Sequence, residues 1–371
     1  MLDQDDVIIH FWQNVVNQAL QSRASDIHVE PENGVSHIRL RVDGHLKHLT
    51  SSPSNWHERI TSRIKILARL DIAEKRLPQD GQMLIGYQEN DPNIDCRIST
   101  LPTLHGEKIV LRILNQSAGD LDLNLLGFTD CQLAGLKSAL NKSQGFILVT
   151  GPTGSGKTHT LYSCLKQLMD GTKNLTSIED PIEVQLKGVN QVHVNEKAGL
   201  RFDNALRALM RQDPDVIMVG EIRDLKTAEV AFQAAETGHL VLATLRANDA
   251  PSALWRLKQL GIGLDQLANN LICITAQRLV RLFCHHCAGQ VTLANNEPCH
   301  VCDGTGFKGR TGIHQVLPIN DELRTLIESG ATLTVINEYC QLSQIINLQE
   351  SAQLLVDRGI TNQAEAMRYT A

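Results

Sequence analysis

The sequence has 371 residues, of which 42% are hydrophobic and 20% charged, and its formal net charge is −6. This length indicates two or three domains, and the composition is typical of a globular protein with hydrophobic cores. The acidic balance argues against binding nucleic acid through overall charge. No apolar run reaches the roughly 18 residues of a membrane span, and the first residues are acidic, unlike a signal peptide. We therefore expect a cytoplasmic protein.

The first part of the chain predicts a small α+β domain over residues 1–114. An amphipathic helix is expected over 3–24, and a second helix over about 55–74. Between them, apolar and polar residues alternate over 35–49 on either side of Asp43-Gly44. This pair favours a tight hairpin turn. Two further strands are expected over 95–102 and 108–114. The polar stretch 115–124 is interpreted as an interdomain linker and hinge.

The second part, residues 125–371, alternates buried strands with helices. This pattern predicts a parallel sheet that is covered on both faces, an α/β architecture. A helix is expected near 129–141, and strands over 146–150, 215–220 and 240–245. From about residue 284 the pattern changes to a cysteine-rich insert. A helical tail of two or three helices follows over 321–371, with Gly330 and Gly359 as helix stops.

The stretch GPTGSGKT fits the pattern of a phosphate-binding loop between a strand and a helix. Glycines let backbone N–H groups close around phosphates, and the helix N-terminus adds partial positive charge. Lys157 is expected to reach the β- and γ-phosphates of ATP, and the Thr158 hydroxyl to bind Mg²⁺. The predicted nucleotide-binding residues are Gly151, Pro152, Thr153, Gly154, Ser155, Gly156, Lys157 and Thr158.

Carboxylates follow two of the predicted strands. Glu221 comes after the strand DVIMVG and is the candidate to polarise the attacking water, the alternative being a salt-bridged surface residue. Glu179, Asp180 and Glu183 lie in the stretch SIEDPIE and can orient Mg²⁺ or water. Acidic residues are common in loops, so this second group remains open on the sequence alone.

Arginines form the other half of a phosphate site. Arg207 and Arg211 are four residues apart on one face of a predicted helix, whereas Arg97 and Arg112 fall on predicted strands of the first domain. Hydrolysis benefits when an arginine neutralises charge on the γ-phosphate, and that arginine can come from another domain or subunit. Taken alone, each of these residues fits a solvated or salt-bridging role better than a functional one.

Four of the nine cysteines form two C-x-x-C pairs separated by eleven residues. Such pairs bind Zn²⁺ tetrahedrally as thiolates. We therefore predict a structural zinc site, without an open position for catalysis, at Cys284, Cys287, Cys299 and Cys302. The other five cysteines are expected to be small buried apolar residues.

From about residue 20 to the C-terminus, the chain strongly resembles the secretion ATPases of type II secretion and type IV pilus assembly. The resemblance is carried by motifs in a fixed order: RASDIHVEP, RLRVDG, RLPQDGQ, DCRISTLPTLHGEKIVLRIL, GPTGSGKTHTLY, SIEDPIE, LRALMRQDPDVIMVGEIRD, TGHLVLATL, AQRLVRLFCHHC and GRTGIHQVLPI.

The resemblance implies a PAS-like domain followed by a RecA-like core, in a subunit of a homo-hexameric ring. Lys157 and Thr158 match the Walker A motif and Glu221 the Walker B motif, and the three acids of SIEDPIE match the aspartate box. The four arginines resemble phosphate-sensing residues. The tetracysteine insert is similar to that of assembly ATPases, which favours pilus extension or protein secretion over retraction. The implied partners are an inner-membrane platform protein and, indirectly, pilin or pseudopilin.

Two features depart from the family pattern. The family's histidine box has two histidines seven residues apart; His239 matches the first as a candidate catalytic residue, but Arg246 stands at the second. A histidine at this second position can hydrogen-bond the γ-phosphate. Arginine is longer and always charged, so this contact differs or is lost. Many assembly ATPases also carry an additional N-terminal domain, whereas this chain begins almost at the PAS-like domain.

Three functions remain to be distinguished. The main hypothesis is a motor that couples ATP hydrolysis to pilin or pseudopilin assembly, peripheral at the inner membrane through its partners. One alternative is an inactive or partner-activated ring scaffold. The other is a motor that moves nucleic acid, which is disfavoured by the acidic charge and by an aromatic content of 4%.

Overall fold

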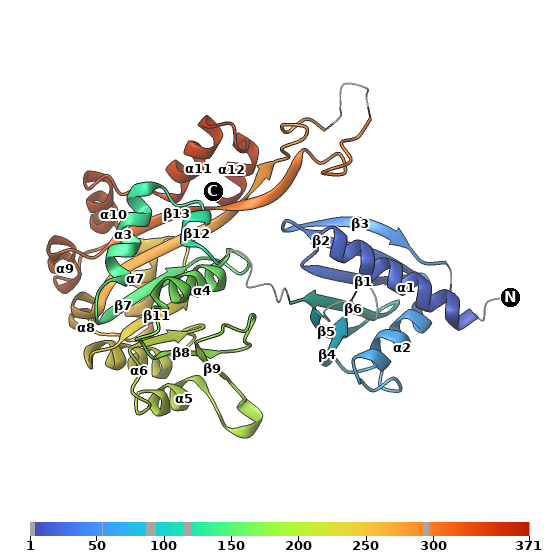
Figure 1. The fold of residues 1–371 in the computed structure, drawn as a ribbon, viewed down its shortest axis with the longest axis horizontal. Coiled ribbons are helices and arrows are strands. Elements are labelled where there is room, and N and C mark those ends of the chain that lie inside the picture. The colour runs from blue at the N-terminus through green and yellow to red at the C-terminus, as the bar shows by residue number, and fades with distance from the viewer. Residues whose placement is uncertain (1–3, 54, 87–93, 115–120, 292–296, 371) are drawn as a thin grey trace. The chain divides into compact units, whose positions relative to one another are not determined.

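This computed structural model describes residues 4–53, 55–86, 94–114, 121–291 and 297–370 (Figure 1). The chain divides into two compact units, residues 1–117 and 118–371. Each unit has its own sheet and its own hydrophobic core, and each is described separately here.

The first unit contains a six-stranded antiparallel sheet in the order β3-β2-β1-β6-β5-β4. Side chains of helices α1 and α2 pack on one face of this sheet, where Ile27, Ile38 and Leu111 are fully buried. This arrangement agrees with the expected α+β class, while the PAS-like fold stays a prediction. The elements are α1 (Gln4–Gln21), β1 (Asp26–Glu32), β2 (Val35–Val42), β3 (His45–Ser51), α2 (His57–Leu67), β4 (Gln79–Ile85), β5 (Ile94–Thr103) and β6 (Gly106–Ile113).

The predicted hairpin at Asp43-Gly44 is confirmed. Both residues have positive φ, 50° and 85°, as a primed two-residue turn between β2 and β3 requires. The second predicted helix is shorter than expected, because α2 ends at Leu67 and Arg69 adopts a left-handed φ of 56°. The right-handed helix cannot continue through that conformation.

The predicted linker is too long at its C-terminal end. Residues 115–120 lie outside the described residues, but Leu121 and Leu123 are buried among side chains of the second unit. Leu123 begins a short 3₁₀ turn, η1 (Leu123–Leu125), which Asp122 caps. Residues 121–124 therefore belong to the second unit and not to a hinge.

The second unit contains a seven-stranded sheet in the order β13-β12-β7-β11-β10-β8-β9. All neighbouring strands are parallel except β12 and β13. Helices cover both faces, as predicted: α3 and α4 lie with Ile147 and Val149 on one side, and α5 to α8 with Phe146 and Leu148 on the other. The strands are β7 (Gly145–Thr150), β8 (Leu175–Glu179), β9 (Asn190–His193), β10 (Val216–Val219), β11 (Leu240–Leu245), β12 (Leu271–Phe283) and β13 (Phe307–Pro318).

The helices of the second unit connect these strands and then continue into a C-terminal tail. They are α3 (Asp130–Leu140), α4 (Lys157–Leu168), η2 (Glu196–Ala198), α5 (Phe202–Leu209), α6 (Leu225–Glu236), α7 (Ala250–Leu260), α8 (Leu264–Asn270), α9 (Asp321–Glu328), α10 (Leu333–Leu342), α11 (Leu348–Asp357) and α12 (Gln363–Thr370). Among the described residues, none of the helices has both the length and the apolar character needed to cross a bilayer.

The tail has four helices instead of the two or three expected. Helix α10 was missed because Thr332, its N-cap, follows so closely on the predicted stop at Gly330. Gly330 and Gly359 both have positive φ, 71° and 66°, where a helix ends. The tail packs on the sheet through buried side chains such as Leu323 and Ala352.

One buried ion pair fastens the last helix to the long strand β12. The Glu365 carboxylate, whose side chain is 2% exposed, accepts hydrogen bonds from Arg281 Nε at 3.0 Å and Nη2 at 2.6 Å. It also accepts the backbone N–H of Arg281, and the guanidinium lies 4.1 Å from the centre of the Phe307 ring. These contacts restrain α12, β12 and β13 together.

We expect Glu365→Ala to lower the free energy of unfolding by roughly 3 kcal/mol, because it leaves the buried guanidinium unpaired. Urea unfolding followed by circular dichroism measures this change. Asp321→Ala is the control, since the Asp321 carboxylate is fully exposed and its distance to Arg324 is 3.9 Å. An equal effect of the two substitutions would contradict the assignment.

Candidate active site

The loop between β7 and α4 has the backbone that phosphate binding requires. Gly151, Gly154 and Gly156 have positive φ of 148°, 79° and 87°. At Gly151 an added Cβ would lie 2.5 Å from the Gln277 carbonyl oxygen, so the chain passes too closely for a side chain. The Ser155 hydroxyl is buried and has no hydrogen-bonding partner among the described residues. These features suit a loop that closes around an anion.

Lys157 begins helix α4 and turns back over the loop. Its Nζ donates to the carbonyl oxygens of Gly151 and Pro152, both at 2.9 Å. Burial lowers the pKa of Lys157, and the nearby charges of Arg246 and Arg278 lower it further, while Glu221 opposes them. The ammonium group therefore lies within the loop, held by backbone oxygens that leave its charge available to a phosphate. Thr158, the next residue, is half-buried in the first turn of α4.

A residue that the sequence analysis missed holds the loop in place. Gln277 on β12 is 1% exposed; its Nε2 donates to the Ser155 carbonyl oxygen at 2.6 Å. Its Oε1 accepts from the Thr160 hydroxyl on α4 at 2.8 Å. One amide thus joins the loop, the following helix and the neighbouring strand. Gln277 stands beside Arg278 in a strand that contains further polar residues, so no local sequence pattern indicates this contact.

Glu221 lies just beyond β10 and is held by two arginines. Its Oε1 accepts from Arg246 Nε at 2.6 Å, and its Oε2 from Arg223 Nε at 3.0 Å. Burial would raise the pKa of Glu221, but these two hydrogen bonds outweigh burial and lower it. Arg223 Nη1 also lies 3.6 Å from Asp180 Oδ2. The carboxylate therefore remains ionised and faces the same region as Lys157.

Glu179 is not arranged as a catalytic acid. It is 2% exposed, and its carboxylate accepts hydrogen bonds from the hydroxyls of Tyr162 and Ser177 and from Gln191 Nε2. Tyr162 OH also accepts the backbone N–H of Glu183, at 3.2 Å. We infer that Glu179 anchors the acidic loop, whereas Asp180 and Glu183 are exposed and remain candidates for water or Mg²⁺.

Within this chain, the structure does not bring His239 to the loop, and a catalytic role for His239 stays a prediction. His239 precedes β11, whose register pairs Leu240 with Gly145 and Leu245 with Thr150. The loop follows Thr150, so His239 lies at the opposite end of the strands, roughly 20 Å away at about 3.3 Å per residue. Its Nδ1 is instead 2.8 Å from the carbonyl oxygen of Ala234.

The four arginines lie in two places. Arg207 is exposed on α5, and Arg211 follows the end of that helix, where its Nη1 donates to the Arg207 carbonyl oxygen at 2.8 Å. Arg97 and Arg112 are cross-strand neighbours on β5 and β6 of the first unit. Arg112 Nε donates to the buried Asp26 carboxylate at 3.1 Å. Their contact with a phosphate stays a prediction.

The four predicted zinc ligands lie together in the connection between β12 and β13. Their sulfur atoms are all within 4.8 Å of one another, and Cys287 and Cys302 are 3.7 Å apart. Four thiolates around zinc at about 2.3 Å would be separated by about 3.8 Å. All four side chains are buried, and the Gly306 N–H donates to Cys302 Sγ at 3.3 Å. The residues therefore fit a structural zinc ion.

The remaining cysteines are buried, as predicted, with the exception of Cys131, which is exposed on α3. His286 and His300, beside the zinc ligands, pack against each other with ring centres 4.8 Å apart. Both histidines are exposed and are not required as ligands.

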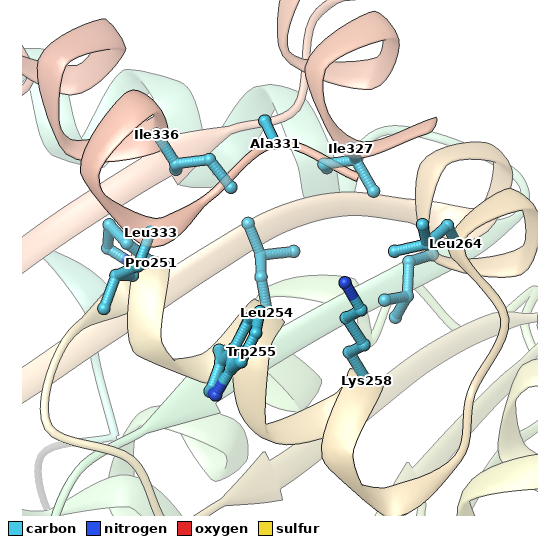
Figure 2. Close-up of a pocket in the computed structure, with 10 residues that line it drawn as sticks. Pro251, Leu254, Trp255, Lys258, Leu264, Ile327, Ala331, Leu333 and Ile336 are labelled. Atoms are coloured by element: carbon cyan, nitrogen blue, oxygen red, sulfur yellow. The ribbon is translucent and has the colours of Figure 1, made fainter. Parts of the chain in front are cut away.

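A separate pocket lies between α7, α8, α9 and α10 (Figure 2). Its lining is almost entirely apolar, and Lys258 provides the one charged side chain, 5.0 Å above the ring of Trp255. The pocket has no glycine-rich loop and no carboxylate in its lining. It therefore lacks the groups that bind a nucleotide and its metal.

We expect Gln277→Ala to weaken nucleotide binding about tenfold, because two hydrogen bonds that hold the loop are lost. Titration of the protein with a fluorescent ADP analogue measures the Kd. Gln290→Ala, an exposed glutamine near the zinc ligands, is the control. Unchanged binding in Gln277→Ala would show that the loop holds its shape without this amide.

We expect about one zinc ion per chain in the purified protein, and its loss in Cys299→Ser. Atomic absorption measures the metal, and thermal unfolding is expected at a lower temperature in the variant. Cys131→Ser should change neither value. Full zinc content in Cys299→Ser would contradict the four-thiolate assignment.

Comparisons with known proteins agree with this arrangement. The model of the family described as "Type II/IV secretion system protein" matches residues 1–368. The type II secretion system protein HxcR of Pseudomonas aeruginosa is 44% identical over 100% of this chain and 79% of its own length. The type IV pilus assembly ATPase PilB of Thermus thermophilus is 41% identical over 97% of this chain and 42% of its own length.

Solved structures show the same fold. The ATPase DotB of Legionella pneumophila superposes with a TM-score of 0.74 at 19% identity, covering 96% of this chain and 94% of DotB. The pilus retraction motor PilT, solved with bound ADP, gives a TM-score of 0.67 at 26% identity, covering 96% of each chain. On the match of its sequence to the family model and to these relatives, the chain belongs to the family of type II/IV secretion system proteins.

Proposed function

We propose that this protein hydrolyses ATP and that it works as the motor subunit of a hexameric machine that assembles pilins or pseudopilins. The observation that carries the proposal is the position of Lys157 and Glu221. The ammonium group lies within a glycine-rich loop, and the Glu221 carboxylate is near enough for its charge to favour the charged form of Lys157. Membership of a family that includes secretion and pilus assembly ATPases supports it.

The hydrolysis step follows from the chemistry of these groups. Backbone N–H groups of residues 151–158 and the Lys157 ammonium bind the phosphates of ATP. Thr158 would hold Mg²⁺, and the ion would neutralise charge that develops on the phosphate oxygens. Glu221 orients a water molecule and accepts its proton as the water attacks the γ-phosphorus, and the bond to the β-phosphate oxygen breaks. Asp180 and Glu183 hold water near the metal.

Arginines complete the proposed site. Arg97 and Arg112 from the first unit, and Arg207 and Arg211 from the second, stabilise negative charge on the γ-phosphate, from the same chain or from a neighbour in the ring. Contact from the first unit would depend on the γ-phosphate. ATP and ADP would then favour different arrangements of the two units, which is how hydrolysis performs mechanical work.

The relatives support the proposed partners. Relatives named as type II secretion proteins and type IV pilus assembly ATPases match nearly the whole chain. We therefore place this protein in the cytoplasm, at the inner membrane through a platform protein, where it drives pilin or pseudopilin assembly. Zinc bound by the four cysteines stabilises the connection between β12 and β13.

The first test is Mg²⁺-dependent ATP hydrolysis by the purified chain. We expect Lys157→Ala and Glu221→Gln to lower turnover at least about a hundredfold, because each removes a group that acts on the transferred phosphoryl group. Lys166→Ala is the matched control: it removes an exposed lysine from the same helix, α4. Phosphate release measures turnover, and light scattering measures the mass with and without nucleotide.

The outcomes separate the alternatives. A mass near six subunits, together with turnover that Lys157→Ala and Glu221→Gln abolish, would support the motor. A folded, zinc-containing ring without turnover, even with platform protein added, would favour a scaffold. Salt-sensitive binding of DNA in a filter assay would revive the nucleic-acid motor.

A further inference from the structure

Arg246 lies beside the nucleotide loop because of strand register. Strands β11 and β7 are parallel, and Leu245 pairs with Thr150. The next residue on each strand is therefore Arg246 on β11 and Gly151, the first glycine of the loop, on β7. Adjacent strands are about 4.8 Å apart, so the Arg246 backbone passes directly alongside the loop.

The side chain of Arg246 is only partly engaged. Its Nε donates to Glu221 Oε1 at 2.6 Å, and the side chain is 61% exposed. Among the residues that the structure describes, its two Nη groups have no hydrogen-bonding partner. A guanidinium can bind a planar or tetrahedral oxyanion through two N–H groups at once, so these free donors can receive a second anion.

Glu221, by contrast, is fully engaged. Arg246 binds one carboxylate oxygen and Arg223 binds the other. A carboxylate that is bound on both oxygens by permanent cations is a poor acceptor for the proton of a water molecule. For Glu221 to act on water, at least one of these two contacts has to loosen.

The surroundings supply a reason for Arg246 to be the one that moves. Of the charged groups that act on Lys157 in the loop, Glu221 favours the charged form of the lysine, whereas Arg246 and Arg278 disfavour it. Arg278 is fixed by the backbone carbonyl oxygens of Asn248 and Gln277, at 2.7 and 3.0 Å. Arg223 is turned toward Asp180 as well as Glu221. Among the described residues, Arg246 has one hydrogen-bonding or ion-pairing partner, Glu221, whereas Arg223 and Arg278 each have two.

We propose that Arg246 is a catalytic residue that binds the terminal phosphate of the nucleoside triphosphate and, in doing so, releases one oxygen of Glu221 to accept the proton of the attacking water. This inference rests on the proposed ATPase function. A terminal phosphate carries more negative charge than a carboxylate and offers three oxygens, so it competes effectively for the guanidinium. A nucleoside diphosphate has no group at that position and leaves the contact between Arg246 and Glu221 in place.

The test compares the affinities of ADP and of a non-hydrolysable ATP analogue with an imido group between its β- and γ-phosphorus atoms. Isothermal titration calorimetry gives both Kd values in the presence of Mg²⁺. We expect Arg246→Gln to weaken binding of the ATP analogue about tenfold or more, because a charge-assisted contact is lost. The Kd of ADP should stay within about twofold of the wild-type value.

Arg223→Gln is the matched control. It removes the same charge and the other partner of Glu221, but at a position that faces Asp180. It should leave the ratio of the two Kd values unchanged. If the arginines acted only by neutralising charge, both variants would lose the same affinity for the ATP analogue. Equal losses of affinity in Arg246→Gln and Arg223→Gln would therefore overturn our inference. Unchanged binding of both nucleotides in Arg246→Gln would overturn it too.

Two further variants, Arg246→Lys and Lys157→Ala, are measured with the same two nucleotides. Arg246→Lys keeps the positive charge but loses the paired N–H donors of the guanidinium. If Arg246→Gln weakens binding through loss of a phosphate contact, Arg246→Lys should bind the ATP analogue more tightly than Arg246→Gln does. Lys157→Ala should weaken both nucleotides. If the wild-type protein binds neither nucleotide, the proposed ATPase function fails and this inference with it. If Lys157→Ala weakens both nucleotides but Arg246→Gln weakens neither, only this inference fails.

Discussion

The candidate site depends on the register of the parallel strands in the second unit. Thr150 of β7 lies opposite Leu245 of β11, and Val219 of β10 lies opposite Ala243. The residues that follow these strands consequently emerge at one edge of the sheet, where the carboxyl ends of parallel strands form ligand sites. Lys157, Glu221 and Arg246 meet there because the backbone ladders fix where each strand ends, and the same register keeps His239 at the other edge.

Two of the cations at this edge, Lys157 and Arg278, are held by neutral oxygens. Lys157 is hydrogen-bonded to the carbonyl oxygens of Gly151 and Pro152, and Arg278 to those of Gln277 and Asn248. Carbonyl oxygens fix the direction of a cation without cancelling its charge. These two cations are therefore positioned before any anion binds, and the cost of orienting them is met in folding, as in other preorganised electrostatic sites.

The sequence was sufficient wherever local chemistry determines structure. The glycine pattern predicted the loop, Asp43-Gly44 predicted a turn with two positive φ values, and the cysteine spacing predicted a cluster. It was insufficient where a role depends on distant partners. Gln277 reaches a loop more than a hundred residues earlier in the chain, and nothing in its immediate neighbourhood indicates this contact. His239 matched a motif, but only the pairing of β11 with β7 reveals which edge of the sheet it occupies.

The three acids of SIEDPIE show how position within one stretch divides roles. Glu179 is the last residue of β8 and is buried, with two hydroxyls and one amide as its donors, whereas Asp180 and Glu183 are exposed beyond the strand. Tyr162 is part of α4, and its hydroxyl accepts the N–H groups of Glu183 and Val184. The helix that begins with Lys157 is thus joined to the acidic loop through one buried hydroxyl. A shift of α4 must therefore be shared with that loop or must break these hydrogen bonds, of which the one between Tyr162 and Glu179 is buried and costly to lose.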